Sequence, residues 1–437
     1  MRWKSVVVWA AVSVGLFGCG RVDESDVGAA DGRLGSSVAG LLPEANREPV
    51  DAPHDVTAGR SHEWRYAGRM VFADEEEAAE IWTPRVDRSL PSKPNDVSDT
   101  IITGDARSGD MYEVKLDREE IRRLGELLTA AGANRHTYGD DGRTAEQGED
   151  SVDDGFTTKG WSDGVDNRTY KGIVNGSVSH WPWRTIGQLK SNGRGEEADG
   201  HCTATFVGNQ GDANRRYIIT AAHCMWTFDG LYRDPDFWPR QDGCLDANGN
   251  PVSGCDQGPY GEWDGTWWMM PAYFPQNCVA APYTNECEAN DIAVMRMHRT
   301  SGASFPGAMG FVPASTAYLD SVAKYHRGYP DCDEPGFPAN CRAKSLYGDY
   351  TLGVEERDVQ NGVVRIYNHS SDMNGGHSGG PLYLYASNGW VQVFAVAVAE
   401  DCWGSFCTER FPNTARNITL AWYNDMVNWI NWHEANP

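Results

Sequence analysis

Short apolar runs separated by turn residues dominate the chain from residue 172 onwards. The runs are rich in β-branched and aromatic side chains, a pattern typical of strands. They are Thr203–Val207, Tyr217–Thr220, Asp291–Met295 and Gln392–Val398. Several short strands of this kind, punctuated by turns, predict an all-β sandwich or barrel.

Two stretches instead repeat apolar residues at helical spacing. The C-terminal repeat predicts a closing helix over Ala421–Trp432. The upstream repeat predicts a helix within Met111–Ala131, with Asp117 as its cap. The first repeat consists of Trp422, Met426, Trp429 and Ile430, and the second of Leu116, Ile121, Leu124, Leu127 and Leu128.

The region before residue 172 has a different composition. Residues 20–171 carry 33 acidic and 19 basic side chains, a net charge of −14 (19 minus 33), and no cysteine. They include the acidic run Asp74–Glu77 and a segment rich in Gly and Asp over residues 138–170. Because such composition is typical of linkers, we interpret residues 19–171 as a partly disordered acidic pro-region and linker, with the core-forming domain at 172–437.

The extreme N-terminus has the layout of an export signal. Arg2 and Lys4 precede the apolar run Ser5–Phe17, whose 13 residues are too few to span a bilayer as a helix. The run leads to Cys19 in a stretch that resembles the bacterial lipobox, where cleavage leaves a lipid-bearing cysteine. We therefore expect a signal peptide over residues 1–18, a lipid on Cys19, and an exported cell-envelope protein that is released if the leader is cut. The alternative is an ordinary signal peptide with a nearby cysteine.

Composition and charge narrow the function classes. The chain has 437 residues, of which 40% are hydrophobic and 23% charged, which is enough apolar material for a core. The formal net charge is −24, from 38 basic and 62 acidic side chains. Because this charge repels phosphate backbones, we expect no nucleic-acid partner.

Ten cysteines remain once Cys19 is set aside. An even number in an exported chain indicates a disulfide framework rather than a metal cluster. The ten fall into five sequential couples with short loops, although connectivity does not follow from sequence alone. The predicted bridges are Cys202–Cys224, Cys244–Cys255, Cys278–Cys287, Cys332–Cys341 and Cys402–Cys407.

Three segments bring together the residue types of nucleophilic catalysis. They are Ile218–Cys224 with His223, Asn290–Val294 with Asp291, and Gly375–Leu382 with Ser378. A serine hydroxyl needs an imidazole to take its proton, and a buried carboxylate to hold that imidazole in one tautomer. Backbone N–H groups must also face the developing oxyanion, and glycines allow such a turn. Gly376 and Ser378 would supply the two donors.

These segments resemble the motifs of the chymotrypsin-like serine peptidases, in the same order His, Asp, Ser. The resemblance covers the chain from about Gly172 to its end, and it implies that Cys202 pairs with Cys224. It further implies two antiparallel β-barrels, at about 172–300 and 301–437, with a C-terminal helix and the site in the cleft between them. The implied activity is endopeptidase cleavage of proteins or peptides through an acyl-enzyme, by a monomer without cofactor or metal.

Within that family the chain is similar to the bacterial glutamyl endopeptidase branch, through the opening strand Pro182–Leu189. Gly172–Gly176 resembles a trypsin-type mature start, but the residue before the serine is His377 where trypsin-type enzymes carry an aspartate. The usual ion pair with a freed amino terminus therefore cannot form. We hypothesise that removal of the leader activates the enzyme sterically or through another contact.

The residues of the substrate pocket leave the specificity open. Ala399 stands where glutamate-cleaving relatives carry a histidine, which argues against a glutamate preference. Asp372 lies six residues before Ser378, where trypsin places its pocket aspartate, which would suit Arg or Lys. Backbone N–H groups could instead satisfy Asp372, because a buried charge must be paired.

Other motifs have weaker functional interpretations. Asp246–Asn250 resembles the start of a calcium loop, but Gln257 at the twelfth position favours a β-turn. The aromatic cluster Trp263–Phe274 could bind carbohydrate, although packing is the better interpretation. The spacing of 68 residues from His223 to Asp291 suggests insertions that rim the cleft.

Two competing functions are kept. One is a non-catalytic surface binding protein on a protease scaffold. The other is an α/β-hydrolase esterase that uses Ser378 within Gly376–Gly380, a G-x-S-x-G pattern. Its triad would continue with Asp401 or Asp425 and then His433, on a parallel sheet with many helices.

Overall fold

The computed structural model covers two sheets, the C-terminal helix and their connections. It describes residues 64–69, 100–115, 169–170, 181–190, 201–208, 215–227, 230–231, 235–241, 253, 258–278, 284–314, 316–330, 346–349, 354–360, 363–368, 373, 375–386, 390–399, 402–403, 409–410 and 413–435. The predicted signal peptide and the predicted lipidation site Cys19 lie outside these residues. No helix among them is long and apolar enough to cross a membrane.

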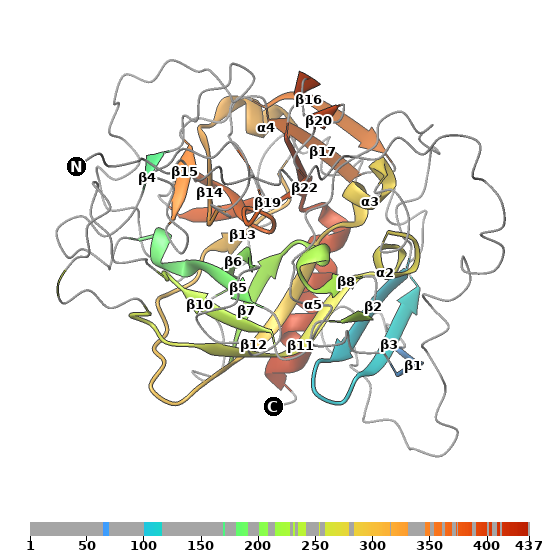
Figure 1. The fold of residues 1–437 in the computed structure, drawn as a ribbon. Helices are drawn as coiled ribbons and strands as arrows, with labels where there is room; N and C mark the ends of the chain where they lie inside the picture. The colour runs from blue at the N-terminus through green and yellow to red at the C-terminus, as the bar shows by residue number, and fades with distance from the viewer. Residues whose placement is uncertain are drawn as a thin grey trace, which may run out of the picture.

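Six antiparallel strands close into a barrel in the lower half of Figure 1. The hydrogen-bonded order is β11-β10-β5-β6-β7-β12, and pairing of β12 with β11 completes the ring. The strands are β5 (Ile186–Lys190), β6 (His201–Val207), β7 (Arg215–Thr220), β10 (Asp236–Pro239), β11 (Trp263–Pro271) and β12 (Ala293–Arg299). The strands expected at 203–207, 217–220 and 291–295 are β6, β7 and β12, with the last beginning at Ala293.

Aromatic side chains fill the barrel. The Phe206 ring lies 4.9 Å from that of Phe237 and 5.1 Å from that of Trp263, both edge-on, a favourable arrangement for aromatic pairs. Trp263, Trp268 and Phe274 are fully buried. The aromatic cluster therefore packs in the core, as the packing interpretation predicts, and forms no exposed carbohydrate platform at these three residues.

A second sheet lies above the barrel in Figure 1. Its order is β16-β17-β22-β19-β18-β14-β15-β4, and the short β13 adds a parallel pairing to β19. The central β19 spans the predicted run 392–398. The strands are β4 (Thr169–Tyr170), β13 (Gly310–Phe311), β14 (Lys324–Gly328), β15 (Tyr347–Asp349), β16 (Val354–Gln360), β17 (Val363–Asn368), β18 (Pro381–Tyr385), β19 (Val391–Ala399) and β22 (Asn413–Asn417).

The C-terminal helix α5 (Leu420–Ala435) joins the two sheets and confirms the helix expected from the apolar repeat. Met426, Trp429 and Ile430 are buried in one cluster with residues of both sheets. The Tyr217 ring of β7 lies 5.8 Å from that of Trp429. The amphipathic face of α5 is therefore buried by packing along the boundary between barrel and second sheet.

The other described elements are short. They are the helices η3 (Trp183–Thr185), η5 (Ala222–Cys224), α2 (Tyr273–Asn277), α3 (Asn285–Asn290) and α4 (Thr316–Ser321), and the two-residue strand pairs β8 (Trp226–Thr227) with β9 (Gly230–Leu231) and β20 (Cys402–Trp403) with β21 (Glu409–Arg410).

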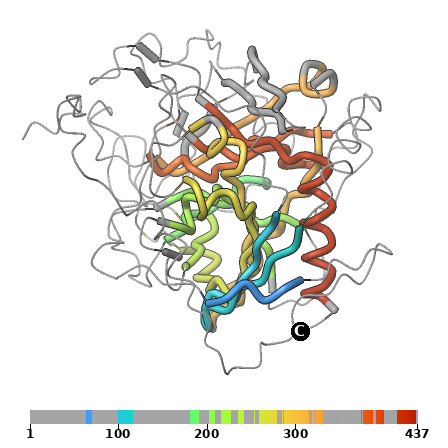
Figure 2. The backbone as a smooth tube through the Cα atoms, turned by 90° about the vertical axis from the view of Figure 1, so that its right-hand side faces the viewer, coloured from blue at the N-terminus to red at the C-terminus, as the bar shows by residue number. Residues whose placement is uncertain are grey.

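Part of the acidic region is built into the barrel sheet. Strands β1 (Arg65–Arg69), β2 (Thr100–Asp105) and β3 (Asp110–Lys115) form an antiparallel extension, in which β2 pairs with β11 from Ile101 opposite Pro271 to Asp105 opposite Trp267. Figure 2 shows these strands, in blue and cyan, running beside the red α5.

The sequence did not predict strand β3. Residues 111–115 belong to β3, whereas the predicted helix, with its cap at Asp117 and its apolar repeat at 116–128, lies outside the described residues and stays a prediction. Met111, Tyr112 and Val114 are buried because β3 pairs with β1 and β2 and packs into the core. Partner strands, which the local sequence does not contain, select the strand conformation of this segment.

Candidate active site

The ends of two paired barrel strands bring His223 and Asp291 together. Thr220, the last residue of β7, pairs with Ala293, the first residue of β12. His223 follows three residues after this pair within η5, and Asp291 precedes it by two at the end of α3. In an antiparallel pair, residues just beyond one strand's end face those just before its partner's start. The register of β7 and β12 therefore places both side chains at one edge of the barrel.

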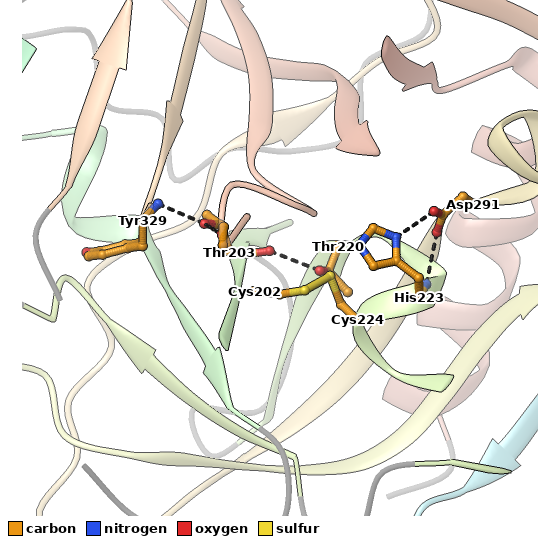
Figure 3. The surroundings of a disulfide bond; sticks show 8 residues. Cys202, Thr203, Thr220, His223, Cys224, Asp291 and Tyr329 are labelled. Atoms are coloured by element: carbon orange, nitrogen blue, oxygen red, sulfur yellow. Dashed lines mark hydrogen bonds and ion pairs between the residues drawn. A yellow bond between two sulfur atoms is a disulfide. The ribbon is translucent and has the colours of Figure 1, made fainter. Parts of the chain in front are cut away.

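The contact between the two side chains is short and buried. His223 Nδ1 lies 2.6 Å from Asp291 Oδ2, and the backbone N–H of His223 donates to Asp291 Oδ1 at 2.9 Å. Both side chains have no solvent exposure. Figure 3 shows one carboxylate oxygen of Asp291 at the imidazole and the other at the backbone nitrogen of His223. A carboxylate on Nδ1 fixes the tautomer that leaves Nε2 able to accept a proton.

A disulfide secures the histidine segment to the neighbouring strand. Cys202 of β6 and Cys224 of η5 are bonded, with their Cα atoms 5.8 Å apart. The Thr220 hydroxyl donates to the Thr203 carbonyl at 2.9 Å beside this bridge (Figure 3). His223 is thus fixed on one side by a covalent bond and on the other by Asp291.

The turn that carries Ser378 is held against the same strand β6. The Thr203 N–H donates to the Ser378 carbonyl at 2.8 Å, and the Thr203 hydroxyl donates to the Gly376 carbonyl at 2.7 Å. Ser378 is largely buried, with an exposed fraction of 6%. Gly376 adopts φ +83°, a left-handed conformation that favours glycine.

Gly379 shows how closely this turn approaches the histidine segment. It has φ +79°, and a Cβ there would lie 2.3 Å from the Thr203 carbonyl oxygen and 2.9 Å from the Ala221 nitrogen. Only a residue without a side chain fits this space. The chain next to Ser378 therefore contacts the chain two residues before His223, and all three sequence motifs meet at one boundary between barrel and second sheet.

His377 is directed away from this point, into the second sheet. It is fully buried, and its ring centroid lies 5.3 Å from that of His326 in β14. A Cβ on Gly328 would lie 2.5 Å from His377 Cδ2. The imidazole thus occupies space next to β14. Sequence reasoning noted His377 but missed His326, which follows no recognisable motif.

The two substrate-pocket residues are not described at the side-chain level. Asp372 lies outside the described residues, and only the backbone of Ala399 is described, at the end of β19. Ala397 is the residue of β19 next to the serine turn: its carbonyl accepts from Gly379 N at 2.8 Å, and its N–H donates to the Gly380 carbonyl at 2.9 Å.

A second predicted disulfide is also present, between Cys278 at the end of α2 and Cys287 in α3, with Cα atoms 5.5 Å apart. It connects the short helix before Asp291 to the segment that follows β11. The bridges expected at Cys244–Cys255, Cys332–Cys341 and Cys402–Cys407 fall on residues whose side chains lie outside the described set.

One group of carboxylates has the spacing of metal ligands. Oxygens of Asp236, Glu262 and Asp264 lie within 4.8 Å of one another, and Asp236 stands opposite Asp264 across the β10–β11 pair. The proposed calcium-like loop Asp246–Asn250 lies outside the described residues. Acidic clusters are common on protein surfaces, so this group by itself assigns no metal.

A buried cation lies near Asp291, and no sequence motif indicated it. Arg416 of β22 is 2% exposed and donates from Nε to the carbonyl of Ala289 in α3 at 2.5 Å. Burial lowers the pKa of Arg416 to about 9, while attraction to the Asp291 carboxylate raises that pKa. The guanidinium is therefore charged at neutral pH despite its burial.

Comparison with known proteins gives structural likeness only. No protein-family model matches this sequence, and no curated protein does. Among solved structures, the protease Anisep from Arthrobacter nicotinovorans is 20% identical, covering 55% of this chain and 91% of its own, at a TM-score of 0.35. The scabies mite inactivated protease paralogue S-D1 is 13% identical, covering 58% of this chain and 94% of its own, at a TM-score of 0.34.

The architecture itself defines the class. A closed six-stranded barrel, a second sheet and a single C-terminal helix, with the three motifs meeting at the boundary between the sheets, form the chymotrypsin-like fold. The predicted fold class is confirmed.

Proposed function

We propose that this protein is a serine endopeptidase whose nucleophile is Ser378. The observation that carries the proposal is the fully buried contact between His223 and Asp291 beside the turn of Ser378. A carboxylate-bound imidazole beside a glycine-rich turn that carries a serine suits one chemical use, which is to activate the hydroxyl for attack on a carbonyl.

The reaction follows from these roles. The Ser378 Oγ attacks the carbonyl carbon of the substrate while its proton passes to His223 Nε2. Asp291 keeps the imidazole oriented and stabilises the imidazolium. The C–N bond then breaks, and the imidazolium gives its proton to the leaving amine. Water, deprotonated by His223, cleaves the resulting ester between Ser378 and the acyl group and restores the hydroxyl.

The oxyanion of each tetrahedral intermediate needs donors fixed in advance. The N–H groups of Gly376 and Ser378 would serve. The Ser378 N–H shares a peptide plane with the His377 carbonyl, and that carbonyl accepts from Gly380 N at 2.8 Å, which fixes the orientation of the plane. The bonds from Thr203 of β6 to the Gly376 and Ser378 carbonyls hold the rest of the turn. Preorganised donors of this kind contribute about 100- to 1,000-fold in rate.

Labelling with a fluorophosphonate tests the proposal directly. We expect the processed wild-type protein to be labelled and Ser378→Ala to remain unlabelled. Ser321→Ala is a matched control, because Ser321 is exposed and its hydroxyl bonds only locally, to the Tyr318 carbonyl. Correctly processed wild-type protein that takes no label would instead favour the non-catalytic binding protein.

The α/β-hydrolase alternative conflicts with the fold. An α/β-hydrolase needs a parallel sheet flanked by helices, whereas the described sheets pair antiparallel except for β13 with β19. His433, its required base, contacts Arg296 of β12 and the Trp429 ring on α5 instead. The esterase alternative is therefore set aside.

Substrate preference is proposed only at the level of peptides. The likeness of Pro182–Leu189 to the glutamyl endopeptidase branch favours acidic residues before the cut, whereas Asp372 would favour Arg or Lys. Cleavage of a mixed peptide library, with Ser378→Ala as the background control, distinguishes the two. If the protein cleaves after Arg or Lys and Asp372→Asn loses this preference, Asp372 determines the specificity of the pocket. If the protein cleaves after acidic residues and Asp372→Asn leaves this preference unchanged, the likeness to the glutamyl endopeptidase branch extends to specificity.

Processing and export complete the proposal. We expect cleavage near Gly172–Ile173 to generate the active form, and N-terminal sequencing of labelled protein checks this. Labelled protein that keeps residues 20–170 attached would contradict it.

The two disulfides are compatible with an extracellular location. Fatty-acid incorporation that disappears in Cys19→Ser would support the lipid anchor, and equal incorporation in both proteins would refute it.

A further inference from the structure

The loop that carries Asp291 is packed against the second sheet by strand β22. Arg416 Nε donates to the Ala289 carbonyl at 2.5 Å, and Arg416 Nη1 also donates to the Asn417 carbonyl. The Thr414 hydroxyl, two residues earlier on the same face of β22, donates to Glu288 Oε1 at 2.8 Å. Two side chains of one strand thus hold the short helix α3 immediately before Asp291.

The bond from Arg416 satisfies the Ala289 carbonyl, which α3 cannot satisfy itself. The last carbonyls of a helix have no partner within it and need an outside donor when buried. Ala289 lies in the last turn of the six-residue α3, and its 2% exposure excludes solvent. The guanidinium supplies the donor from a different sheet, so the position of Asp291 depends on the contact between the two halves of the fold.

The segment that leads to Asp291 also buries several negative charges. Segment 286–291 buries three carboxylates, on Glu286, Glu288 and Asp291, and each is at most 5% exposed. Buried carboxylates are costly unless they are paired. Arg416 brings a guanidinium into contact with this segment, and its pKa responds to the charge on Asp291.

From these contacts we propose that Arg416 is a positioning residue of the active site. Its buried guanidinium holds the Asp291 loop against the second sheet, places a positive charge beside that loop, and so keeps the Asp291 carboxylate directed at His223. This inference rests on the proposed function. It adds a positive charge from the second sheet beside the His223–Asp291 pair, whose two residues both lie next to barrel strands.

The expected consequence is a shift in the pH dependence of labelling. Loss of a cation near the imidazole favours its protonated form, so labelling of a neutral Arg416 variant should require a higher pH than labelling of the wild type. The neighbouring charged residues in the described part of the chain are Glu286 and Glu288 of α3, and β17 places Arg365 opposite Arg416 in register. These remain when Arg416 is replaced, so a shift reports Arg416 itself.

The test is the rate of fluorophosphonate labelling of full-length, processed protein between about pH 4 and pH 9, which follows deprotonation of the base. Arg416→Gln and Arg416→Met remove the charge. We expect the acidic limb of their pH profile, the range over which labelling slows as pH falls, to move up by about half to one pH unit. Arg416→Lys keeps the charge, and we expect its limb to stay at the wild-type position. All three should label about 10- to 100-fold more slowly, because Asp291 is less well placed.

Thr414→Val is the matched control. It removes the other bond between β22 and α3 without changing the charge of Arg416. We expect slower labelling and lower thermal stability, but no upward shift of the limb comparable to that of the neutral Arg416 variants. A limb that moves equally in Thr414→Val and Arg416→Gln would overturn the proposal, since loosening alone would then explain it.

The remaining outcomes are also decisive. If the neutral variants fail to fold while Arg416→Lys folds and keeps the wild-type limb, a cation is required at this position and the proposal stands. If the neutral variants label with the wild-type limb, or if Arg416→Lys also fails to fold, Arg416 has only a structural role and the proposal falls. Absence of labelling in the wild type would refute the proposed function instead.

Discussion

At the scale of single residues, the site depends on small side chains as much as on reactive ones. Thr203 uses its backbone N–H and its hydroxyl to hold the serine turn, and the Tyr329 N–H donates to the same hydroxyl at 2.9 Å. Thr203 therefore connects β6 to both the serine turn and the segment after β14. None of these contacts involves a reacting atom, yet they determine where Ser378 can be.

Gly379 gives a stability prediction at this scale. We expect Gly379→Ala to lower the free energy of unfolding by more than about 3 kcal/mol, because its Cβ would meet backbone atoms of β6 and of the histidine segment in addition to the strain of a positive φ. Chemical denaturation measures the loss, and fluorophosphonate labelling should disappear with it.

Gly302→Ala is the matched control for Gly379→Ala. Gly302 has φ +89°, but a Cβ there would meet nothing within 4 Å. We expect a loss of about 1 kcal/mol, from the backbone conformation alone. Equal losses in the two variants would show that the close approach of the serine turn to β6 and to the histidine segment does not contribute.

At the scale of elements, a strand from the acidic region connects the barrel to the C-terminal helix. The Thr103 hydroxyl of β2 donates to the Trp268 carbonyl of β11 at 2.5 Å and accepts from Trp429 Nε1 of α5 at 2.9 Å. All three residues are buried. One hydroxyl thus satisfies two polar groups from elements that are more than 150 residues away in the sequence.

We expect Thr103→Val to lower the free energy of unfolding by about 1–3 kcal/mol, because the indole N–H and the carbonyl would lose this partner while buried. Thermal or urea unfolding measures it. Ser108→Ala at the tip of the same hairpin removes only a part-buried bond from the Asp110 N–H and should cost less than about 1 kcal/mol. A neutral Thr103→Val would contradict the structural role of β2.

At the scale of the whole molecule, the hairpin of β2 and β3 bears on what processing can remove. Ile101, Ile102, Met111 and Val114 are buried in the two main core clusters. Releasing this hairpin would expose these side chains and the paired edge of β11 to water. Burial of a single such side chain stabilises a fold by about 1.5–3 kcal/mol, so dissociation of the hairpin would be strongly unfavourable.

We therefore predict that cleavage near Gly172 leaves the fragment with residues 100–115 bound to the peptidase domain. Native size-exclusion chromatography should elute both pieces together, and denaturing electrophoresis with mass spectrometry should separate them. Uncleaved protein run in parallel is the control. Processed protein that labels with fluorophosphonate and lacks residues 100–115 would show that this hairpin is dispensable.

The sequence by itself determined the parts of this protein that depend on local pattern. Alternating and β-branched runs indicated β6, β7 and β19, helical spacing indicated α5, and neighbouring cysteines indicated the bridges Cys202–Cys224 and Cys278–Cys287. The motifs around His223, Asp291 and Ser378 also stood out, because each chemical role restricts its residue types within a few positions.

Only the tertiary structure decided the contacts between distant segments. Nothing near Met111 indicates that β3 will pair with β1 and β2, so this strand was not predicted. Nothing near Arg416 indicates that the Asp291 loop will lie against it, since the two are brought together by the packing of two sheets. Local patterns restrict what a segment can form, whereas burial and partner strands, which no local pattern contains, select what it does form and which charges meet.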